Sequence, residues 1–184
     1  MYLNRDSKII FFHVPKNAGT TAQALFVKKY GESSVLTRSL DVSHMTAMHL
    51  KTLYGIDLSC YSLYMISRNP YDSEISYYLY MIKNKSHRYN EVIAKLSFEE
   101  YLEWRVINPG VSQIEYFIEG MVVFQFESMD LLYKHFSFDR DVIRNASGSR
   151  KRRFYTQASA DIVFNLRKAD FRQFNYSRDS WSCY

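Results

Sequence analysis

The sequence is poor in the residues that build disulfide frameworks, linkers and membrane spans. It contains 2 cysteines, 3 prolines and 6 glycines among 184 residues. Two cysteines, Cys60 and Cys183, are too few for a disulfide framework or a cysteine-ligated metal site. The low glycine and proline content argues against long linkers and low-complexity segments. A chain of this length without linkers is expected to form a single domain over residues 1–184.

Long apolar runs are also absent. No uninterrupted apolar stretch approaches the ~18 residues that a membrane-spanning helix needs. The first residues, Met1-Tyr2-Leu3-Asn4-Arg5-Asp6, lack the apolar core of a signal peptide. We therefore expect no stable membrane insertion and a cytoplasmic location.

Aromatic residues and a mild excess of positive charge are what the sequence has in abundance. There are 16 Tyr, 13 Phe and 2 Trp, and the net charge is +5. Tyrosines can line a groove that stacks on sugars or bases, and they can equally fill a half-buried core. The positive charge suits an anionic ligand without requiring one.

Three apolar runs predict buried strands. The run Ile9-Ile10-Phe11-Phe12-His13-Val14 is nearly continuous, as in a central parallel strand that is covered on both faces. Residues 61–66 and 121–126 have the same character. Each run is followed by helical spacing, over about 20–30, 70–83 and 128–136. Alternating strands and helices predict an α/β fold with a central parallel β-sheet flanked by helices.

Local end signals mark the helices. Thr20 and Thr21 are expected to cap the first helix, and Gly31 to end it. Asn69 and Pro70 suit the N-cap and first position of the second helix. Ser97-Phe98-Glu99-Glu100 is a capping box for a further helix. A last amphipathic helix is expected over 157–172, after a polar loop at 144–153 that ends in four basic residues.

The loop between the first strand and helix has the residues of an anion site. Lys16 supplies a cation, Gly19 allows close approach of the backbone, and Thr20 and Thr21 supply hydroxyl donors beside a helix N-terminus. The loop is not a Walker A motif, because Lys16 precedes Gly19. These residues alone predict either a phosphate or sulfate cradle or an ordinary capped helix.

The second strand–helix junction adds a further cation. Arg68 ends the strand, and Ser76 lies two turns into the helix. An arginine here can bind a phosphate through two hydrogen bonds, or it can pair with a neighbouring carboxylate such as Asp72. Ligands gather at the carboxyl ends of parallel strands. The two strand–helix junctions with Lys16 and Arg68, called the basic corners below, therefore suit a ligand with phosphates at both ends.

Both junctions resemble the motifs of sulfotransferases that use 3′-phosphoadenosine 5′-phosphosulfate (PAPS). The 5′-phosphosulfate loop of that family is similar to His13-Val14-Pro15-Lys16-Asn17-Ala18-Gly19-Thr20-Thr21. The 3′-phosphate motif is similar to Arg68-Asn69-Pro70-Tyr71-Asp72 with Ser76 and Tyr78. The most similar branch is the Golgi-type carbohydrate group, which includes heparan sulfate 2-O-sulfotransferases and bacterial relatives. Weaker similarity covers most of the chain in the expected order: Ser43-His44-Met45-Thr46-Ala47, 109–114, 126–129 and 154–176.

The resemblance implies a P-loop-like sulfotransferase fold and transfer of the sulfuryl group from PAPS to a hydroxyl of a carbohydrate or glycoconjugate, without a metal. His44 matches the general base of an in-line displacement, and Lys16 would stabilise charge on the leaving group. The residues implied to bind PAPS are Lys16, Asn17, Gly19, Thr20, Thr21, Arg68, Ser76, Arg152, Arg153 and Tyr155. Without the resemblance, His44 would be interpreted as a loop or helix-cap histidine; His13 and His49 are interpreted as structural.

Two other functions predict different sequence patterns. A small-molecule kinase predicts a Walker-type loop and Mg²⁺-binding carboxylates at a strand end, and the sequence has neither pattern. A non-catalytic nucleotide or nucleic-acid binder predicts a broad basic stripe with interleaved aromatics, whereas the densest charge here is confined to 150–153. We therefore expect a carbohydrate acceptor and no nucleic-acid partner. The sequence does not indicate an oligomeric state.

Overall fold

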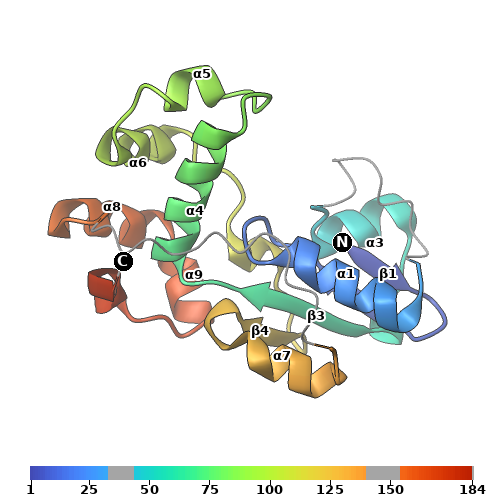
Figure 1. Ribbon diagram of the computed structural model, residues 1–184. Helices are drawn as coiled ribbons and strands as arrows, with labels where there is room; N and C mark the ends of the chain where they lie inside the picture. Colours follow the sequence, from blue (N-terminus) through green and yellow to red (C-terminus); the bar gives the residue numbers. More distant parts are fainter. Residues whose placement is uncertain (33–43, 140–153, 184) are drawn as a thin grey trace. The chain divides into compact units, whose positions relative to one another are not determined.

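The computed structural model describes residues 1–32, 44–139 and 154–183 (Figure 1). These residues form two compact units. The sheet unit contains residues 1–32, 44–68 and 115–139, and the helical unit contains residues 69–114 and 154–183. The expected single domain over 1–184 stays a prediction, because compact units of one chain can belong to one domain.

The sheet unit is built on four described strands, β1 (Tyr2–Asn4), β2 (Ile9–Phe12), β3 (Ser62–Ser67) and β4 (Val122–Gln125), in the order β1-β2-β3-β4. Strand β1 is antiparallel to β2, while β2, β3 and β4 are parallel. The register pairs Ile9 with Ser62 and Tyr64 with Val122. The α/β class and the mostly parallel sheet are therefore confirmed, and the three predicted strands are present with bounds that differ by one or two residues at their ends.

Strand β2 is apolar on both faces because both faces are covered. Ile9 and Phe11 point toward one face and Ile10 and Phe12 toward the other, and all four are buried. On the first face Phe26 is in ring contact with Phe11, at 5.3 Å between centroids. Burial of such a side chain stabilises the fold by about 1.5–3 kcal/mol.

Helices α1 (Gly19–Tyr30) and α7 (Met129–Phe136) pack against this same face. The described part of the sheet unit also contains helix α3 (Ala47–Tyr54) (Figure 1). Short 3₁₀ helices cover Leu58–Cys60 and Phe126–Ser128, and another, Gln113–Tyr116, lies where the chain returns to this unit. Gly31 ends α1 as predicted. The predicted threonine cap is wrong: α1 begins after Ala18, which has a left-handed conformation, and no side chain caps this end.

The helical unit contains α4 (Pro70–Lys83), α5 (Asn90–Ile93), α6 (Phe98–Ile107), α8 (Gln157–Leu166), α9 (Lys168–Gln173) and a 3₁₀ helix at Arg178–Cys183. Asn69 caps α4, with Pro70 at its first position, and Ser97 and Glu100 form the expected capping box of α6. The single helix predicted over 157–172 is interrupted at Arg167, whose backbone leaves helical geometry between α8 and α9.

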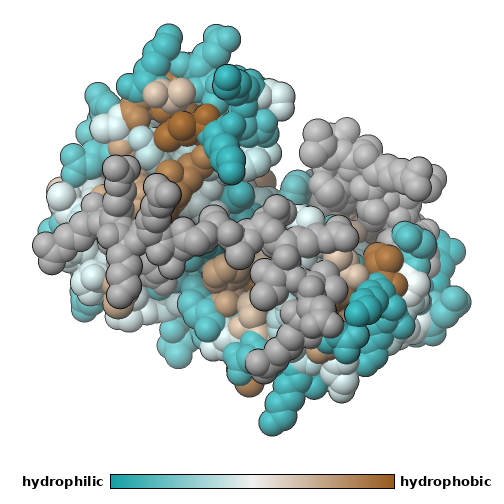
Figure 2. Space-filling model, in the orientation of Figure 1, coloured by the Kyte–Doolittle hydropathy of each residue, from teal (hydrophilic) through white to brown (hydrophobic). Residues whose placement is uncertain are grey.

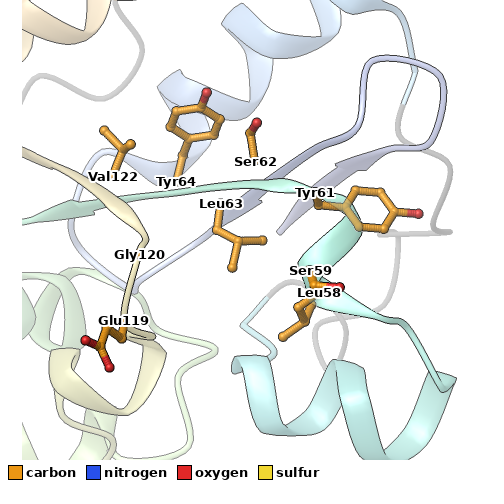
Figure 3. A pocket seen from close by; sticks show the side chains of 9 residues that line it. All are labelled: Leu58, Ser59, Tyr61, Ser62, Leu63, Tyr64, Glu119, Gly120 and Val122. Atoms are coloured by element: carbon orange, nitrogen blue, oxygen red, sulfur yellow. The ribbon is translucent and has the colours of Figure 1, made fainter.

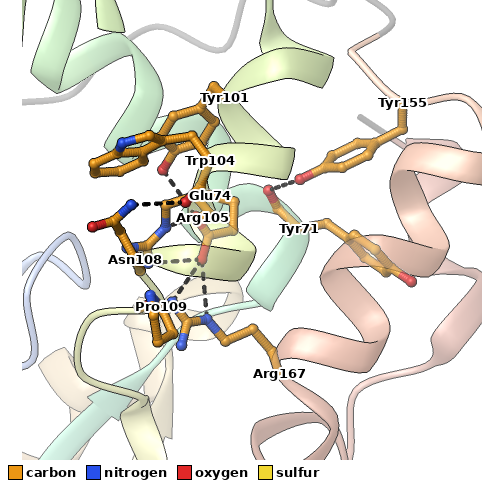
Figure 4. Close-up of polar contacts among 9 residues, drawn as sticks. All are labelled: Tyr71, Glu74, Tyr101, Trp104, Arg105, Asn108, Pro109, Tyr155 and Arg167. Carbon is orange, nitrogen blue, oxygen red and sulfur yellow. Dashed lines mark hydrogen bonds and ion pairs between the residues drawn. The ribbon is translucent and has the colours of Figure 1, made fainter. Parts of the chain in front are cut away.

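A buried ion cluster includes Arg167, the residue at that interruption (Figure 4). Glu74 on α4 is 2% exposed and accepts from Arg105 Nε and Arg167 Nε at 3.0 Å each, and from the Tyr101 hydroxyl at 2.9 Å. Burial alone would raise the pKa of Glu74, but the two guanidinium groups outweigh burial and lower it. Arg167 also donates to the Pro109 carbonyl at 2.5 Å. The cluster therefore ties α4 to α6 and to the α8–α9 junction.

Within the part of the chain that the structure describes, no helix has the length and apolarity to traverse a bilayer. On the face shown in Figure 2, hydrophilic side chains predominate and hydrophobic ones form small patches. The predicted basic loop at 144–153, with Arg152 and Arg153, lies outside the described residues.

Candidate anion site at the carboxyl ends of β2 and β3

The loop between β2 and α1 is shaped as an anion cradle. Lys16 and Ala18 have positive φ values of 66° and 56°, and Asn17 between them does not. Such alternation is typical of loops whose backbone N–H groups form a concavity for anions. The N–H of Asn17 itself donates to the Val14 carbonyl at 3.3 Å, so it helps to close the loop. The first N–H groups of any helix lack acceptors within the helix, and no side chain caps α1. The 12-residue helix α1 also places its positive dipole end here.

Arg68 brings a second cation to the same loop. It follows β3, which pairs in parallel with β2, so both strands end at one edge of the sheet. Arg68 Nη1 donates to the Lys16 carbonyl at 2.6 Å, and the guanidinium carbon lies 4.1 Å from the centroid of the Phe126 ring. Arg68 is only 7% exposed. The two basic corners that the sequence singled out are therefore direct neighbours.

The proximity of the two cations changes the chemistry of Lys16. Burial, and then the charge of Arg68, lower the pKa of the Lys16 ammonium to about 8. An anion bound beside it would favour the charged form and raise this pKa again. The corner is therefore an electropositive site whose charge responds to mildly alkaline pH.

Asn17 has a structural contact in addition to its predicted role. Its side chain is 1% exposed, and Nδ2 donates to the Ile66 carbonyl of β3 at 2.8 Å. This hydrogen bond fastens the loop to the neighbouring strand. Contact of Asn17 with a cofactor stays a prediction.

Thr20 and Thr21 differ in exposure. Thr20 is exposed on the first turn of α1, whereas Thr21 is buried. Of the two, Thr20 is therefore the hydroxyl that a ligand at this helix end could reach directly. Binding by either threonine stays a prediction.

His44 lies beside this loop, just before α3. Its Nδ1 is 3.0 Å from the His13 carbonyl oxygen, and the Tyr116 hydroxyl donates to the His44 carbonyl at 3.1 Å. A carbonyl oxygen only accepts, so Nδ1 carries the proton and Nε2 keeps the lone pair. Burial lowers the pKa of His44, although the hydrogen bond to His13 opposes this. His44 is therefore set up as a neutral imidazole that can accept a proton at Nε2.

Two further histidines, His49 and His13, were interpreted as structural from the sequence. His49 is structural, as predicted: it forms a capping box with Thr46 at the start of α3. His13 follows β2, and its ring lies against Gly19. The centroid of this ring is also 4.6 Å from that of the His44 ring. Sequence reasoning missed this role for His13. Its place directly after a strand, at the carboxyl edge of the sheet, was the available signal.

The remaining predicted residues belong to the helical unit. Ser76 is half-buried on the second turn of α4. Tyr155 is buried, and its hydroxyl donates to the Tyr71 carbonyl at 2.7 Å (Figure 4). Burial raises the pKa of Tyr155 well above its ordinary value, so the phenol stays neutral. In this structure Tyr155 packs within a core, and its contact with a nucleotide stays a prediction.

An open pocket lies at the other end of the strands (Figure 3). It is lined by Leu58, Ser59, Tyr61, Ser62, Leu63, Tyr64, Glu119, Gly120 and Val122. Ser62 begins β3 and Val122 begins β4, whereas Lys16 and Arg68 follow the carboxyl ends of β2 and β3. The pocket is therefore separate from the predicted anion site.

Among the described residues, no group of three or more His, Cys, Asp or Glu side chains has a metal-binding arrangement. Comparisons with protein-family models, curated proteins and solved structures gave no match.

Proposed function

We propose that the protein is a sulfotransferase that transfers a sulfuryl group from PAPS to a hydroxyl, with a carbohydrate or glycoconjugate as acceptor. The observation that supports this most is the 2.6 Å contact between Arg68 Nη1 and the Lys16 carbonyl, which brings two basic strand ends together at one sheet edge. The sequence resemblance assigns these two corners to opposite ends of one nucleotide.

The donor chemistry of the corner fits such a nucleotide. It offers a lysine, a guanidinium, an uncapped helix N-terminus and the exposed hydroxyl of Thr20. All of these favour anions, and backbone N–H groups at a helix N-terminus are common phosphate ligands. Lys16, Thr20 and the first turn of α1 would hold the 5′-phosphosulfate, and Arg68 the 3′-phosphate. Binding by Ser76 stays a prediction.

PAPS supplies the activated sulfuryl group, and the chain supplies positioning, charge and a base. His44 would accept the proton of the acceptor hydroxyl at Nε2, since its Nδ1 is held by the His13 carbonyl. Lys16 would stabilise negative charge as it develops on the departing phosphate oxygen. The lowered pKa of His44 keeps its imidazole neutral, and thus able to act as a base, at pH 7.

Calorimetry with the product nucleotide, 3′-phosphoadenosine 5′-phosphate, tests the proposal against its nearest alternative, an ATP-dependent kinase. We expect the bisphosphate to bind much more tightly than ATP, with or without Mg²⁺. Preference for Mg²⁺-ATP would overturn the proposal in favour of the kinase. Transfer itself is then tested with a radiolabelled PAPS donor and a panel of oligosaccharide and simple alcohol acceptors.

Arg68→Ala should weaken binding of the bisphosphate about tenfold or more, as expected for a lost charged hydrogen bond of about 1.5–3 kcal/mol. Lys51→Ala is the matched control, because it removes the same charge from an exposed position on α3 of the same unit. Equal affinities of the two variants would mean that Arg68 does not contact the nucleotide.

A further inference from the structure

The His13 ring occupies the space that a side chain at Gly19 would need. Gly19 is the first residue of α1 and is not among the described glycines with positive φ. Its backbone therefore has no need of glycine's conformational freedom. A Cβ at this position, however, would lie 1.9 Å from His13 Cδ2 and 2.3 Å from His13 Nε2. Only a residue without a side chain leaves room for the imidazole ring.

The same ring also meets His44. The two rings are edge-on, with centroids 4.6 Å apart and planes inclined by 65°. The backbone of His13 is also engaged, because its carbonyl oxygen is 3.0 Å from His44 Nδ1. His13 thus contacts the first turn of α1 with its ring, and holds His44 with both ring and carbonyl.

The His13 ring has the properties of a spacer and not of a proton carrier. Its Nδ1 is buried and has no hydrogen-bond partner in the described structure. Burial is the main cause that lowers the pKa of His13 to about 3, so the ring stays neutral over the working range of most enzymes. A hydrogen bond with the Gln23 side chain opposes this lowering of the pKa but does not reverse it. The shape of the neutral ring is what Gly19 and His44 meet.

We propose that His13 is a positioning residue that couples the start of α1 to His44: its ring fills the space between Gly19 and the His44 imidazole, and its carbonyl keeps His44 in the tautomer with a free Nε2. The benefit to catalysis rests on the proposed function, in which α1 holds the donor and His44 is the base. The coupling itself does not depend on that function. It predicts that a change at Gly19 or His13 alters His44.

Four variants test the coupling. His13→Ala removes the spacer, and His13→Phe restores a ring of similar shape without nitrogen atoms. Gly19→Ala forces the ring away, and the double variant Gly19→Ala/His13→Ala relieves the clash. The readout is the ¹⁵N chemical shifts of the His44 imidazole, which report its tautomer, measured without any nucleotide.

We expect the wild type and His13→Phe to show one tautomer, with the proton on Nδ1 of His44. His13→Ala and Gly19→Ala should show a mixture, because His44 is no longer held in one orientation. Gly19→Ala should lower the Tm of the wild type but not that of His13→Ala. Unchanged His44 chemical shifts in His13→Ala and Gly19→Ala would overturn the proposal. So would a Gly19→Ala substitution that lowers the Tm of the wild type and of His13→Ala by the same amount.

Activity separates this inference from the proposed function. If the bisphosphate nucleotide does not bind to the wild type while the His44 shifts respond as expected, the transferase proposal fails and the coupling stands. If transfer is observed, the kcat of His13→Ala should fall with little change in nucleotide affinity, and His13→Phe should recover it. Failure of His13→Phe to recover both kcat and the single tautomer would show that the spacer role is wrong.

Discussion

The pKa of Lys16 gives the sharpest quantitative prediction. An ordinary lysine stays protonated to above pH 10, whereas burial and the charge of Arg68 bring the pKa of Lys16 to about 8. Lys16 is then about nine-tenths protonated at pH 7 and about one-tenth protonated at pH 9. If the ammonium contacts the nucleotide, a bound anion raises its pKa, so binding takes up a proton at alkaline pH.

The sign of the effect follows from this linkage. Because the bound state holds the proton more tightly, affinity is full well below pH 8 and declines as pH rises through the pKa of free Lys16. Between pH 7 and pH 9 the affinity should fall about tenfold, which corresponds to about 1.4 kcal/mol. An unperturbed lysine would give almost no change over this interval.

The assay is calorimetry with 3′-phosphoadenosine 5′-phosphate across this pH interval, in two buffers of different ionisation enthalpy so that proton uptake is counted directly. Lys16→Met keeps the length of the side chain and removes the titrating group, so it should bind weakly with a flat pH dependence. Flat affinity in the wild type, or the same decline in Lys16→Met, would refute the reasoning.

Two further variants test the general base and the ion cluster. His44→Ala should lower turnover by roughly two orders of magnitude or more, the usual contribution of a general base, while calorimetry shows unchanged affinity for the bisphosphate; near-wild-type turnover would remove His44 from the mechanism. Glu74→Gln should lower the free energy of unfolding in urea by about 3–5 kcal/mol, because Arg105 and Arg167 lose their buried counter-charge. Glu103→Gln, an exposed position on α6, is the control, and equal stabilities would mean that the cluster contributes little.

The features predicted well are those encoded by a few adjacent residues. Asn69 and Pro70 define the start of α4, and Ser97 and Glu100 the start of α6, because a cap is made by residues within one turn. Continuous apolarity identified β2 because it reports coverage of both faces. The neighbourhood of Lys16 and Arg68 was also predictable, since parallel strands end at the same edge of a sheet.

The features that were missed depend on contacts between distant parts of the chain. Strand β1 is too short to have a sequence period, and it is defined by its pairing with β2. Arg167, where the helix predicted over 157–172 is interrupted, bonds to Glu74, 93 positions away in the sequence. The role of Gly19 depends on the rotamer of His13, which sequence cannot give. Helical patterns and caps therefore predicted the elements, and only the folded chain revealed how His44 is held.

The two hydrogen bonds that β3 residues and Arg68 make to the β2–α1 loop bear on how a ligand would bind. Asn17 is fastened to the Ile66 carbonyl, and the Lys16 carbonyl to Arg68, before any ligand arrives. Ordering a flexible backbone costs about 1–2 kcal/mol of free energy per residue. For this loop the ordering is part of folding, so it is not repeated when a ligand binds. Preorganisation of this kind lowers the cost of binding, so an anion bound at this loop would lose little affinity to the ordering of the backbone.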